Sequence, residues 1–232
     1  MPDAPRAING LQLEVGERVS RIGAAVDACQ ATIEMAASAG ADLMLVHHGL
    51  FWSGLSPITG THGRRIRTLI KHNISLYSAH LPLDCHPEVG NNYVLARRLG
   101  VGNLEPFGES DGVSIGVAGD LAADRSELVS RIQKTLNFTP RVIATGPARV
   151  ERVGIITGAG SSELTAAVRA GLDTFITGEG PHHTYLQAEE LGINLIYAGH
   201  YATETVGVQV LAAHLSERFA IPWQFLDHPT GM

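Results

Sequence analysis

The apolar residues of this chain change their spacing along its length, from helical to strand-like and back. In residues 18–39 they recur every three or four positions, which predicts one long α-helix that ends before Gly40. A short apolar run at 42–46 follows, and its length is typical of a buried parallel strand. The first hundred residues thus indicate alternating helices and strands, with further helices at 64–72 and 87–99 and a strand at 74–78.

The rest of the chain predicts a small middle segment and a second alternating part. In the middle segment the pattern predicts strands at 113–117, 142–145 and 153–157 and a helix at 126–136. The last third predicts helices at 163–170, 185–191 and 204–219 and strands at 173–177, 194–197 and 223–226. We therefore expect an α/β fold of two similar lobes, 1–104 and 151–232, with a β-α-β insert at 105–150, all in one compact unit.

Composition narrows the class of protein. Of the 232 residues, 44% are hydrophobic and 17% are charged, against about 25% charged in typical soluble chains. This balance excludes a disordered protein and suggests a surface partly covered by other copies of the chain. No run approaches the roughly 18 apolar residues of a membrane span. The net charge of -6 disfavours nucleic acid as a partner. Two cysteines and the absence of a signal-peptide pattern favour a cytoplasmic protein.

Two pairs of matching segments suggest an internal repeat. AGADLMLVHH at 39–48 matches AGLDTFITGE at 170–179, and ISLYSAHLPLD at 74–84 matches NLIYAGHYATE at 194–204. In each half, the second segment has a histidine followed four residues later by an acid. Because both matches occur in the same order, they predict a duplicated α/β unit.

The repeat predicts a metal centre. Ligands bind at the carboxyl ends of parallel strands, and we expect five side chains to converge there in a cleft between the lobes, with His80 close by. Neutral imidazoles and carboxylates are good ligands for divalent ions. Five such ligands exceed what one catalytic ion needs, so we expect two divalent ions about 3.5–4 Å apart. The five residues are His47, His48, Asp84, His200 and Glu204.

Each element of this prediction has an ordinary alternative. The adjacent histidines could simply end a strand, and His200 and Glu204 could surround a helix start capped by Thr203. Glu179 and His183 lie in a loop after a predicted strand, where we expect them to bind substrate. The Gly-Ala-Gly run at 158–160 suits either a phosphate or close helix packing. The histidines that we expect to face solvent or cap helices are His62, His72, His86, His214 and His228.

At these residues the chain resembles the NIF-three-like (interacting factor 3-like) family, known as GTP cyclohydrolase 1 type 2 and its homologues. The resemblance implies a dinuclear centre with the same five ligands, a histidine near the metals at His80, and a toroidal homohexamer built as a trimer of dimers. One departure is Gly49, where many members have proline. The blocks that carry the resemblance are Asn9-Gly-Leu-Gln12, Leu45-Val-His-His-Gly49, Ser78-Ala-His-Leu-Pro-Leu-Asp84, Gly90-Asn-Asn92, the segment 173–179 with His183, and Gly199-His-Tyr-Ala-Thr-Glu204.

The leading hypothesis is a metal-dependent hydrolase of a small polar substrate. The metal ions, which would be zinc, iron, manganese or nickel, would activate water, and His80 would carry a proton. The resemblance implies attack on C8 of the guanine ring of GTP with loss of formate. The alternative hypothesis is a non-catalytic metal-binding ring that acts as a scaffold, a metal-handling factor or a regulator. Nucleic-acid binding inside a ring is a third, disfavoured by the net charge.

Overall fold

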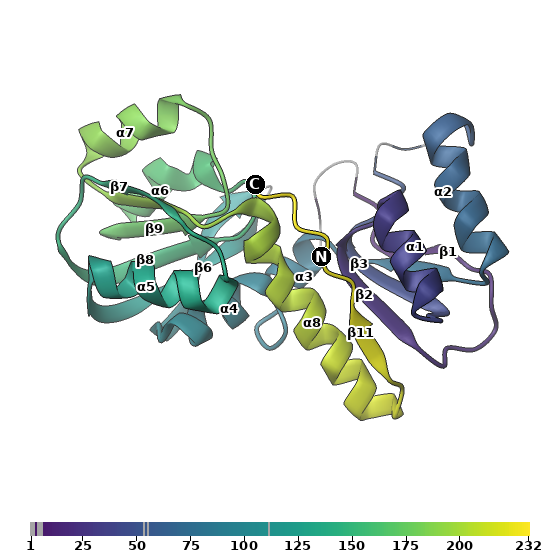
Figure 1. Ribbon diagram of the computed structural model, residues 1–232. Helices are drawn as coiled ribbons and strands as arrows, with labels where there is room; N and C mark the ends of the chain where they lie inside the picture. Colours follow the sequence, from purple (N-terminus) through teal and green to yellow (C-terminus); the bar gives the residue numbers. More distant parts are fainter. Residues whose placement is uncertain (1–2, 4–6, 53, 55, 111) are drawn as a thin grey trace. The chain divides into compact units, whose positions relative to one another are not determined.

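A computed structural model describes residues 3, 7–52, 54, 56–110 and 112–232, and it divides into two compact units (Figure 1). Unit 1 contains Met1–Leu83 and Gly207–His228, and unit 2 contains Asp84–Val206 and Pro229–Met232. The fold is mixed α/β, as predicted, with one sheet in each unit. The divisions differ from the predicted lobes because the chain enters unit 2 at Asp84 and returns to unit 1 at Gly207, within its last long helix.

Unit 1 is built on a five-stranded sheet with the order β1-β4-β3-β2-β11. Strands β2, β3, β4 and β11 run parallel to their neighbours, and β1 pairs with β4 in the antiparallel sense. The strands are β1 Gly10–Leu13, β2 Ile22–Asp27, β3 Leu43–His48, β4 Ser75–Ser78 and β11 Trp223–Phe225. The parallel arrangement brings the carboxyl ends of β2, β3 and β4 to one edge of the sheet.

Helices cover both faces of this sheet. Successive residues in a strand point to opposite faces, so Ala25 and Met44 pack with the core under α1 (Gln30–Ser38) and α2 (Gly60–Lys71). Ala24 and Leu45 pack on the other face, with Ala212 of α8 (His200–Phe219). Strands that are buried on both faces explain why the apolar runs here are continuous.

Unit 2 is built on a six-stranded sheet with the order β5-β6-β8-β9-β10-β7. Strands β8, β9 and β10 are parallel. Strands β6 and β7 flank them in the antiparallel sense, and β5 pairs antiparallel with β6. The strands are β5 Gly102–Ser110, β6 Val113–Asp124, β7 Arg141–Ala144, β8 Arg149–Ile156, β9 Thr174–Thr177 and β10 Asn194–Tyr197. The predicted middle segment is therefore part of the same sheet as the last third of the chain.

The helices of unit 2 lie on both sides of its sheet (Figure 1). On one side, α6 and α7 bury Leu164, Ala167 and Ala188 against Phe175 and Leu195 of the sheet. On the other side lie α4 and α5. The helices of this unit are α4 Asn91–Leu99, α5 Arg125–Leu136, α6 Leu164–Arg169 and α7 His183–Leu191, with a 3-10 helix at Ser161–Glu163 and a short helix α3, Leu81–Asp84, at the entry to the unit.

The two sheets share an order of elements. Three neighbouring parallel strands are joined by two helices in each, β2-α1-β3-α2-β4 in unit 1 and β8-α6-β9-α7-β10 in unit 2. An antiparallel strand then flanks the third parallel strand in both. This order agrees with the predicted repeat, while the duplication itself stays a prediction.

The predicted helix at 18–39 is wrong in its first half. The chain forms β2 at Ile22–Asp27 and only then turns into α1. Strands β1 and β5 were not predicted, and α4 begins at Asn91 instead of residue 87. The other predicted elements are present within a few residues of their predicted ends, apart from β6, which runs on to Asp124.

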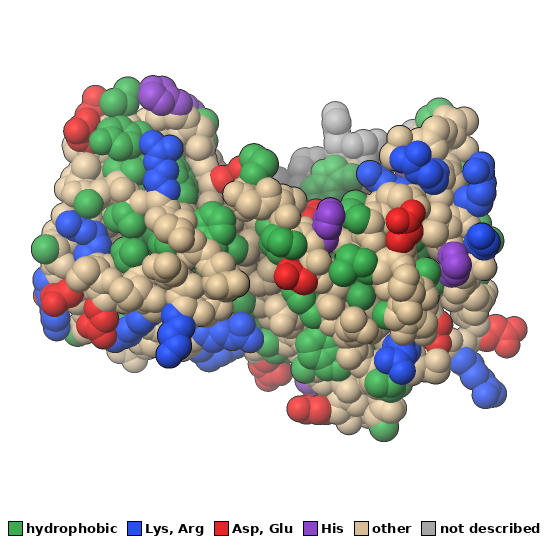
Figure 2. Space-filling model, viewed as in Figure 1, with side chains coloured by type: hydrophobic (Ala, Val, Ile, Leu, Met, Phe, Trp, Pro, Cys, Tyr) green, Lys and Arg blue, Asp and Glu red, His purple; other side chains and the backbone are tan. Residues whose placement is uncertain are grey.

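The surface gives two further observations. On the face drawn in Figure 2, Lys and Arg side chains are interspersed with Asp and Glu side chains. Within the described ranges, every helix is too short or too polar to cross a lipid bilayer.

Candidate metal centre

Three histidines of unit 1 lie together at the carboxyl ends of two parallel strands. His47 and His48 are the last residues of β3, and His80 follows β4 by two residues. The ring centroid of His47 lies 4.6 Å from that of His48 and 5.0 Å from that of His80. One ring nitrogen of each lies within 4.8 Å of the others. We call these three residues the histidine group, and the sequence predicted their proximity.

Each imidazole of the histidine group is held by a hydrogen bond at its Nδ1 atom. His47 Nδ1 donates to the carbonyl oxygen of Ala79 at 2.9 Å, and His48 Nδ1 donates to Asp27 at 2.9 Å. His80 Nδ1 donates to Asp3 at 2.7 Å. Because these hydrogen bonds keep the hydrogen on Nδ1, the neutral ring carries its lone pair on Nε2. This is the arrangement in which metal-binding histidines are oriented.

An aromatic ring borders this group. The indole ring of Trp52 stands edge-on to His80, with centroids 4.5 Å apart, and to His48 at 5.7 Å. Trp52 covers part of both imidazoles with apolar surface, which lowers the local dielectric and strengthens electrostatic interactions there.

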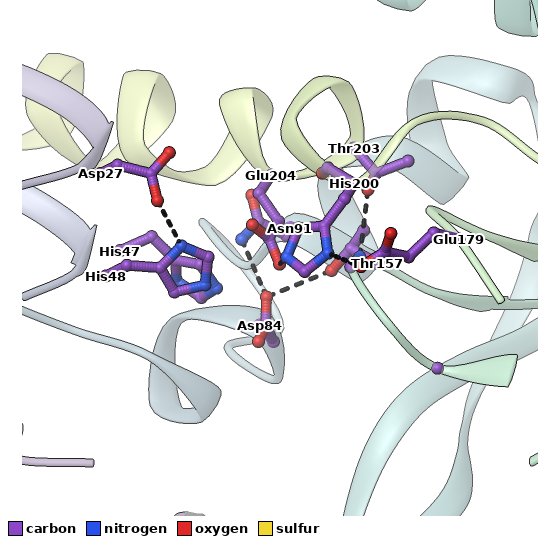
Figure 3. Close-up of polar contacts among 12 residues, drawn as sticks. Asp27, His47, His48, Asp84, Asn91, Thr157, Glu179, His200, Thr203 and Glu204 are labelled. Carbon is purple, nitrogen blue, oxygen red and sulfur yellow. Dashed lines mark hydrogen bonds and ion pairs between the residues drawn. The ribbon is translucent and has the colours of Figure 1, made fainter. Parts of the chain in front are cut away.

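Unit 2 contains a histidine and an acid in the first turn of α8. His200 and Glu204 are four residues apart and so lie on one face of the helix, with Nε2 and Oε1 3.2 Å apart. His200 Nδ1 donates to Glu179 at 2.7 Å, which repeats the pattern of the histidine group (Figure 3). The hydrogen bond to Glu204, helped by the charges of both glutamates, outweighs burial and raises the pKa of His200 to about 9.

The main chain of Gly158 fixes where the Glu204 carboxylate lies. Gly158 has φ +66°, and a Cβ at this position would lie closer than 3.0 Å to Glu204 Oε1 and 3.3 Å from His200 Nε2. Its N–H donates to Thr203 Oγ1 at 3.1 Å. Glycine is therefore needed at 158 for close approach to α8, which supports the packing interpretation of the Gly-Ala-Gly run.

Asp84 is held in a buried polar network of the same unit. Its Oδ1 accepts hydrogen bonds from Asn91 Nδ2 at 2.8 Å and Thr157 Oγ1 at 3.1 Å (Figure 3). Asn92 in turn accepts from the Thr157 N–H at 2.8 Å and donates to Ile115. Asp84, Asn91 and Asn92 are all buried, so the network fixes the orientation of the Asp84 carboxylate. Thr157 and Gly158 are adjacent, and together they support both acidic side chains.

The donors present suit a divalent metal ion. Two donors bound to one ion at about 2.1 Å each lie roughly 3.0–3.4 Å apart, and the His200–Glu204 separation of 3.2 Å falls in this range. All four imidazoles donate a hydrogen bond from Nδ1 to an oxygen acceptor. Nitrogen and oxygen donors of this kind bind zinc, iron, manganese and nickel. The residues therefore fit the metal that the sequence predicted, as ligands whose orientation is fixed before an ion binds.

Comparison with known proteins now places the chain in a family. The sequence profile of Duf34/NIF3 (NGG1p interacting factor 3) matches residues 5–230. The chain belongs to the NIF3 family. It is 46% identical to a Deinococcus radiodurans protein over 228 residues, which cover 97% of this chain and 87% of the relative. An Archaeoglobus fulgidus relative is 43% identical, with 97% and 90% covered. Both relatives are named GTP cyclohydrolase 1 type 2 homolog.

Solved structures of similar proteins share the fold. TTHA1606 from Thermus thermophilus matches with a TM-score of 0.91 and 44% identity, covering 100% of this chain and 92% of the other. Protein ybgI, described as of unknown function, matches with a TM-score of 0.91 and 40% identity, covering 99% and 93%. Reduced HcgD from Methanocaldococcus jannaschii matches with a TM-score of 0.85 and 26% identity, covering 95% and 89%.

Several supporting residues of this NIF3 protein were missed by the sequence analysis. Asp3 and Asp27 orient histidines, and Asn91 and Thr157 orient Asp84. Asp27 ends strand β2, but this segment was predicted as helix, so Asp27 was not recognised as a polar residue at the end of a strand. The Asn91–Asn92 pair was noticed only as part of a family block. The Thr203 cap alternative is excluded, because α8 already begins at His200.

Proposed function

We propose that this NIF3 protein binds two divalent metal ions and hydrolyses a nucleotide. Its ligands are His47 and His48 from unit 1 and Asp84, His200 and Glu204 from unit 2, joined in one dinuclear centre in a cleft between the two parts of the chain. The observation that carries the proposal is that each imidazole donates a hydrogen bond from Nδ1. This leaves the Nε2 atoms of His47, His48 and His200 as the atoms that can bind a metal ion.

Zinc, iron, manganese or nickel, when bound here, would lower the pKa of water and stabilise negative charge that develops on the substrate. The protein supplies orientation. Thr157 holds Asp84, Gly158 limits the position of Glu204, and Asp27 fixes the ring of His48. These fixed contacts reduce the reorganisation that accompanies binding.

His80 is proposed as the residue that moves a proton. Its Nδ1 proton is engaged by Asp3 at 2.7 Å, so proton exchange with the substrate takes place at Nε2. Asp3 keeps the ring in this tautomer and stabilises the imidazolium when the proton is held. Asp3 also accepts from the Leu81 N–H at 3.1 Å, which anchors the carboxylate to the start of α3.

The shared name of the relatives supports GTP as the substrate. In this reaction one water adds to C8 of guanine and the five-membered ring opens to a formamide, and a second water hydrolyses the formamide so that C8 leaves as formate. Glu179 and His183 are proposed to bind the substrate. Glu179 accepts a hydrogen bond from His200, a proposed metal ligand. A substrate that contacts Glu179 would therefore lie close to that metal ligand.

The proposal is tested by metal analysis and formate release on the same preparations. We expect about two transition-metal ions per chain and metal-dependent formate production from GTP. His47→Ala and Glu204→Ala should each lower the metal content and abolish turnover, and His80→Ala should abolish turnover with metal retained. His72→Ala is the control, because His72 is an exposed residue at the end of α2.

Other results distinguish the alternative function. Tight binding of two ions without turnover of GTP or of a panel of nucleotides would favour a non-catalytic scaffold, metal-handling factor or regulator. Formate production that survives both ligand substitutions would refute the proposed centre.

We also propose that the chain assembles as a homohexamer, a trimer of dimers, and works in the reducing cytoplasm. Its two cysteines, Cys29 and Cys85, are both in the reduced thiol form, which agrees with such a compartment. Light scattering on purified protein tests the assembly, and a mass near that of a single chain would refute it.

A further inference from the structure

A pocket of about 700 Å³ lies in unit 2 at the carboxyl ends of two parallel strands. Three segments form it: the loop after β8, the loop after β9 and the start of α7. Pockets of this size hold small molecules, and the carboxyl ends of parallel strands are where α/β folds bind ligands. The lining residues are Ala159, Ser161, Ser162, Glu179, Gly180, Pro181, His183, Thr184 and Gln187.

The charge of this lining disfavours a phosphate chain. Lys and Arg, which usually bind phosphate, are absent from the described lining residues. The one carboxylate in it, Glu179, repels anions. Hydroxyl and amide oxygens are among the other polar groups of the lining, and they accept hydrogen bonds. The pocket is therefore suited to a neutral group that donates hydrogen bonds through nitrogen.

Glu179 connects this pocket to His200, one of the proposed metal ligands. One of its oxygens, Oε1, accepts from His200 Nδ1 at 2.7 Å, and the side chain is 40% exposed. A carboxylate has two oxygens and about four acceptor positions, so Glu179 can bind His200 and a ligand at once. Two adjacent N–H groups on the ligand would match the planar carboxylate, as the N1–H and 2-amino groups of guanine do.

We propose that this pocket binds the guanine base of the substrate through Glu179, and that the phosphates lie outside it. The inference rests on the proposed function for the identity of the substrate, and it adds which part of the substrate is recognised in unit 2. Recognition of N–H donors by a carboxylate also gives specificity, because an analogue without the amino group leaves an acceptor unpaired.

The rigidity of the pocket decides which substitutions can test it. A Cβ on Gly180 would lie 2.6 Å from the Tyr197 hydroxyl and 2.8 Å from Ser161 Oγ, so a side chain there would disturb the fold. Ser162 is exposed and lines the pocket, and a larger side chain can be introduced there without displacing core residues.

The first test compares two matched substitutions by calorimetry with metal-loaded protein. Ser162→Phe should weaken guanosine binding at least tenfold and leave the binding of inorganic tripolyphosphate and the metal content unchanged. The control is Ser126→Phe, which introduces the same side chain at an exposed position of a different pocket in unit 2, and it should bind guanosine as the unsubstituted protein does. Equal guanosine affinity in the two variants would overturn the inference, as would a loss confined to tripolyphosphate.

The second test needs no change of the pocket's shape. Inosine lacks the 2-amino group, so it should bind the unsubstituted protein about tenfold more weakly than guanosine. Glu179→Gln should bring the two affinities close together. Equal binding of guanosine and inosine, or no guanosine binding at all, would contradict the inference.

These outcomes separate the pocket from the reaction. If GTP yields formate and Ser162→Phe leaves its KM unchanged, the pocket assignment is wrong while the proposed function stands. If guanosine binding is lost in Ser162→Phe but formate never forms from GTP, the pocket binds guanine and the proposed reaction is wrong.

Discussion

Gly158→Ala isolates the contact between one backbone position and a proposed metal ligand. Gly158 has φ +66°, and the added Cβ would come closer than 3.0 Å to Glu204 Oε1. Gly171 is a matched control in the same unit, since it has φ +71° and an added Cβ would meet no atom within 4 Å. Both alanines carry the same backbone strain, but only Gly158→Ala displaces the carboxylate.

The two variants should differ little in stability and much in metal binding. Alanine at positive φ costs about 1–2 kcal/mol, and the lower entropy of the unfolded chain offsets roughly 0.4–1 kcal/mol of this. The free energy of unfolding should therefore fall by at most about 1.6 kcal/mol in both variants. The Glu204 carboxylate ends a flexible side chain and can move, but it then leaves its place 3.2 Å from His200 Nε2. Loss of such positioning typically costs about 10–100-fold in metal affinity.

The assay combines chelator competition with NMR titration. Zinc affinity should fall at least tenfold in Gly158→Ala and stay within about twofold in Gly171→Ala. In metal-free protein the pKa of His200, about 9, should fall toward its ordinary value of 6.5 in Gly158→Ala, because its hydrogen bond to Glu204 is the main cause of the increase. An unchanged pKa together with equal zinc affinity in both variants would refute the role given to Gly158.

Three further expectations follow from the same contacts. Thr157→Val removes a hydroxyl that donates to Asp84 and should lower zinc affinity about tenfold, whereas Thr157→Ser should retain it; equal affinities would show that the hydrogen bond is unimportant. Asp27→Ala should lower zinc affinity by a similar factor by releasing the ring of His48, and a result within twofold of the parent would exclude that role. Zinc must displace the proton that His200 holds below pH 9, so affinity measured by competition should rise up to about tenfold per pH unit from 6 to 9 and then level off; a flat profile would exclude His200 as a ligand.

The error at residues 18–39 shows where hydrophobic spacing is ambiguous. In β2 the residues Ile22, Ala24, Ala25 and Val26 are all buried, because helices cover both faces of the sheet. A strand that is apolar on both faces loses its alternation, and its small residues fit a helical pattern equally well. The carboxyl-terminal Asp27 was lost from the candidate site with the strand, although it lies opposite His48 in the sheet register.

The proximity of the histidine group was predictable because its residues end or follow strands in the sequence. His47, His48 and His80 were found because each follows an apolar run that forms a parallel strand. The support of Asp84 could not be predicted from such a pattern. Thr157 and Asp84 are 73 residues apart, and their contact depends on how the end of α3 and the turn after β8 approach in the folded chain. No local spacing carries that information.

The supports of the two kinds of proposed ligand have opposite chemistry. His48, His80 and His200 donate hydrogen bonds to acids, while Asp84 accepts hydrogen bonds from neutral donors. An acid that accepts the Nδ1 hydrogen makes the ring a stronger base at Nε2 and so a better metal ligand. Neutral donors orient the Asp84 carboxylate and leave its negative charge to attract a metal ion. Both kinds of support therefore favour a bound cation.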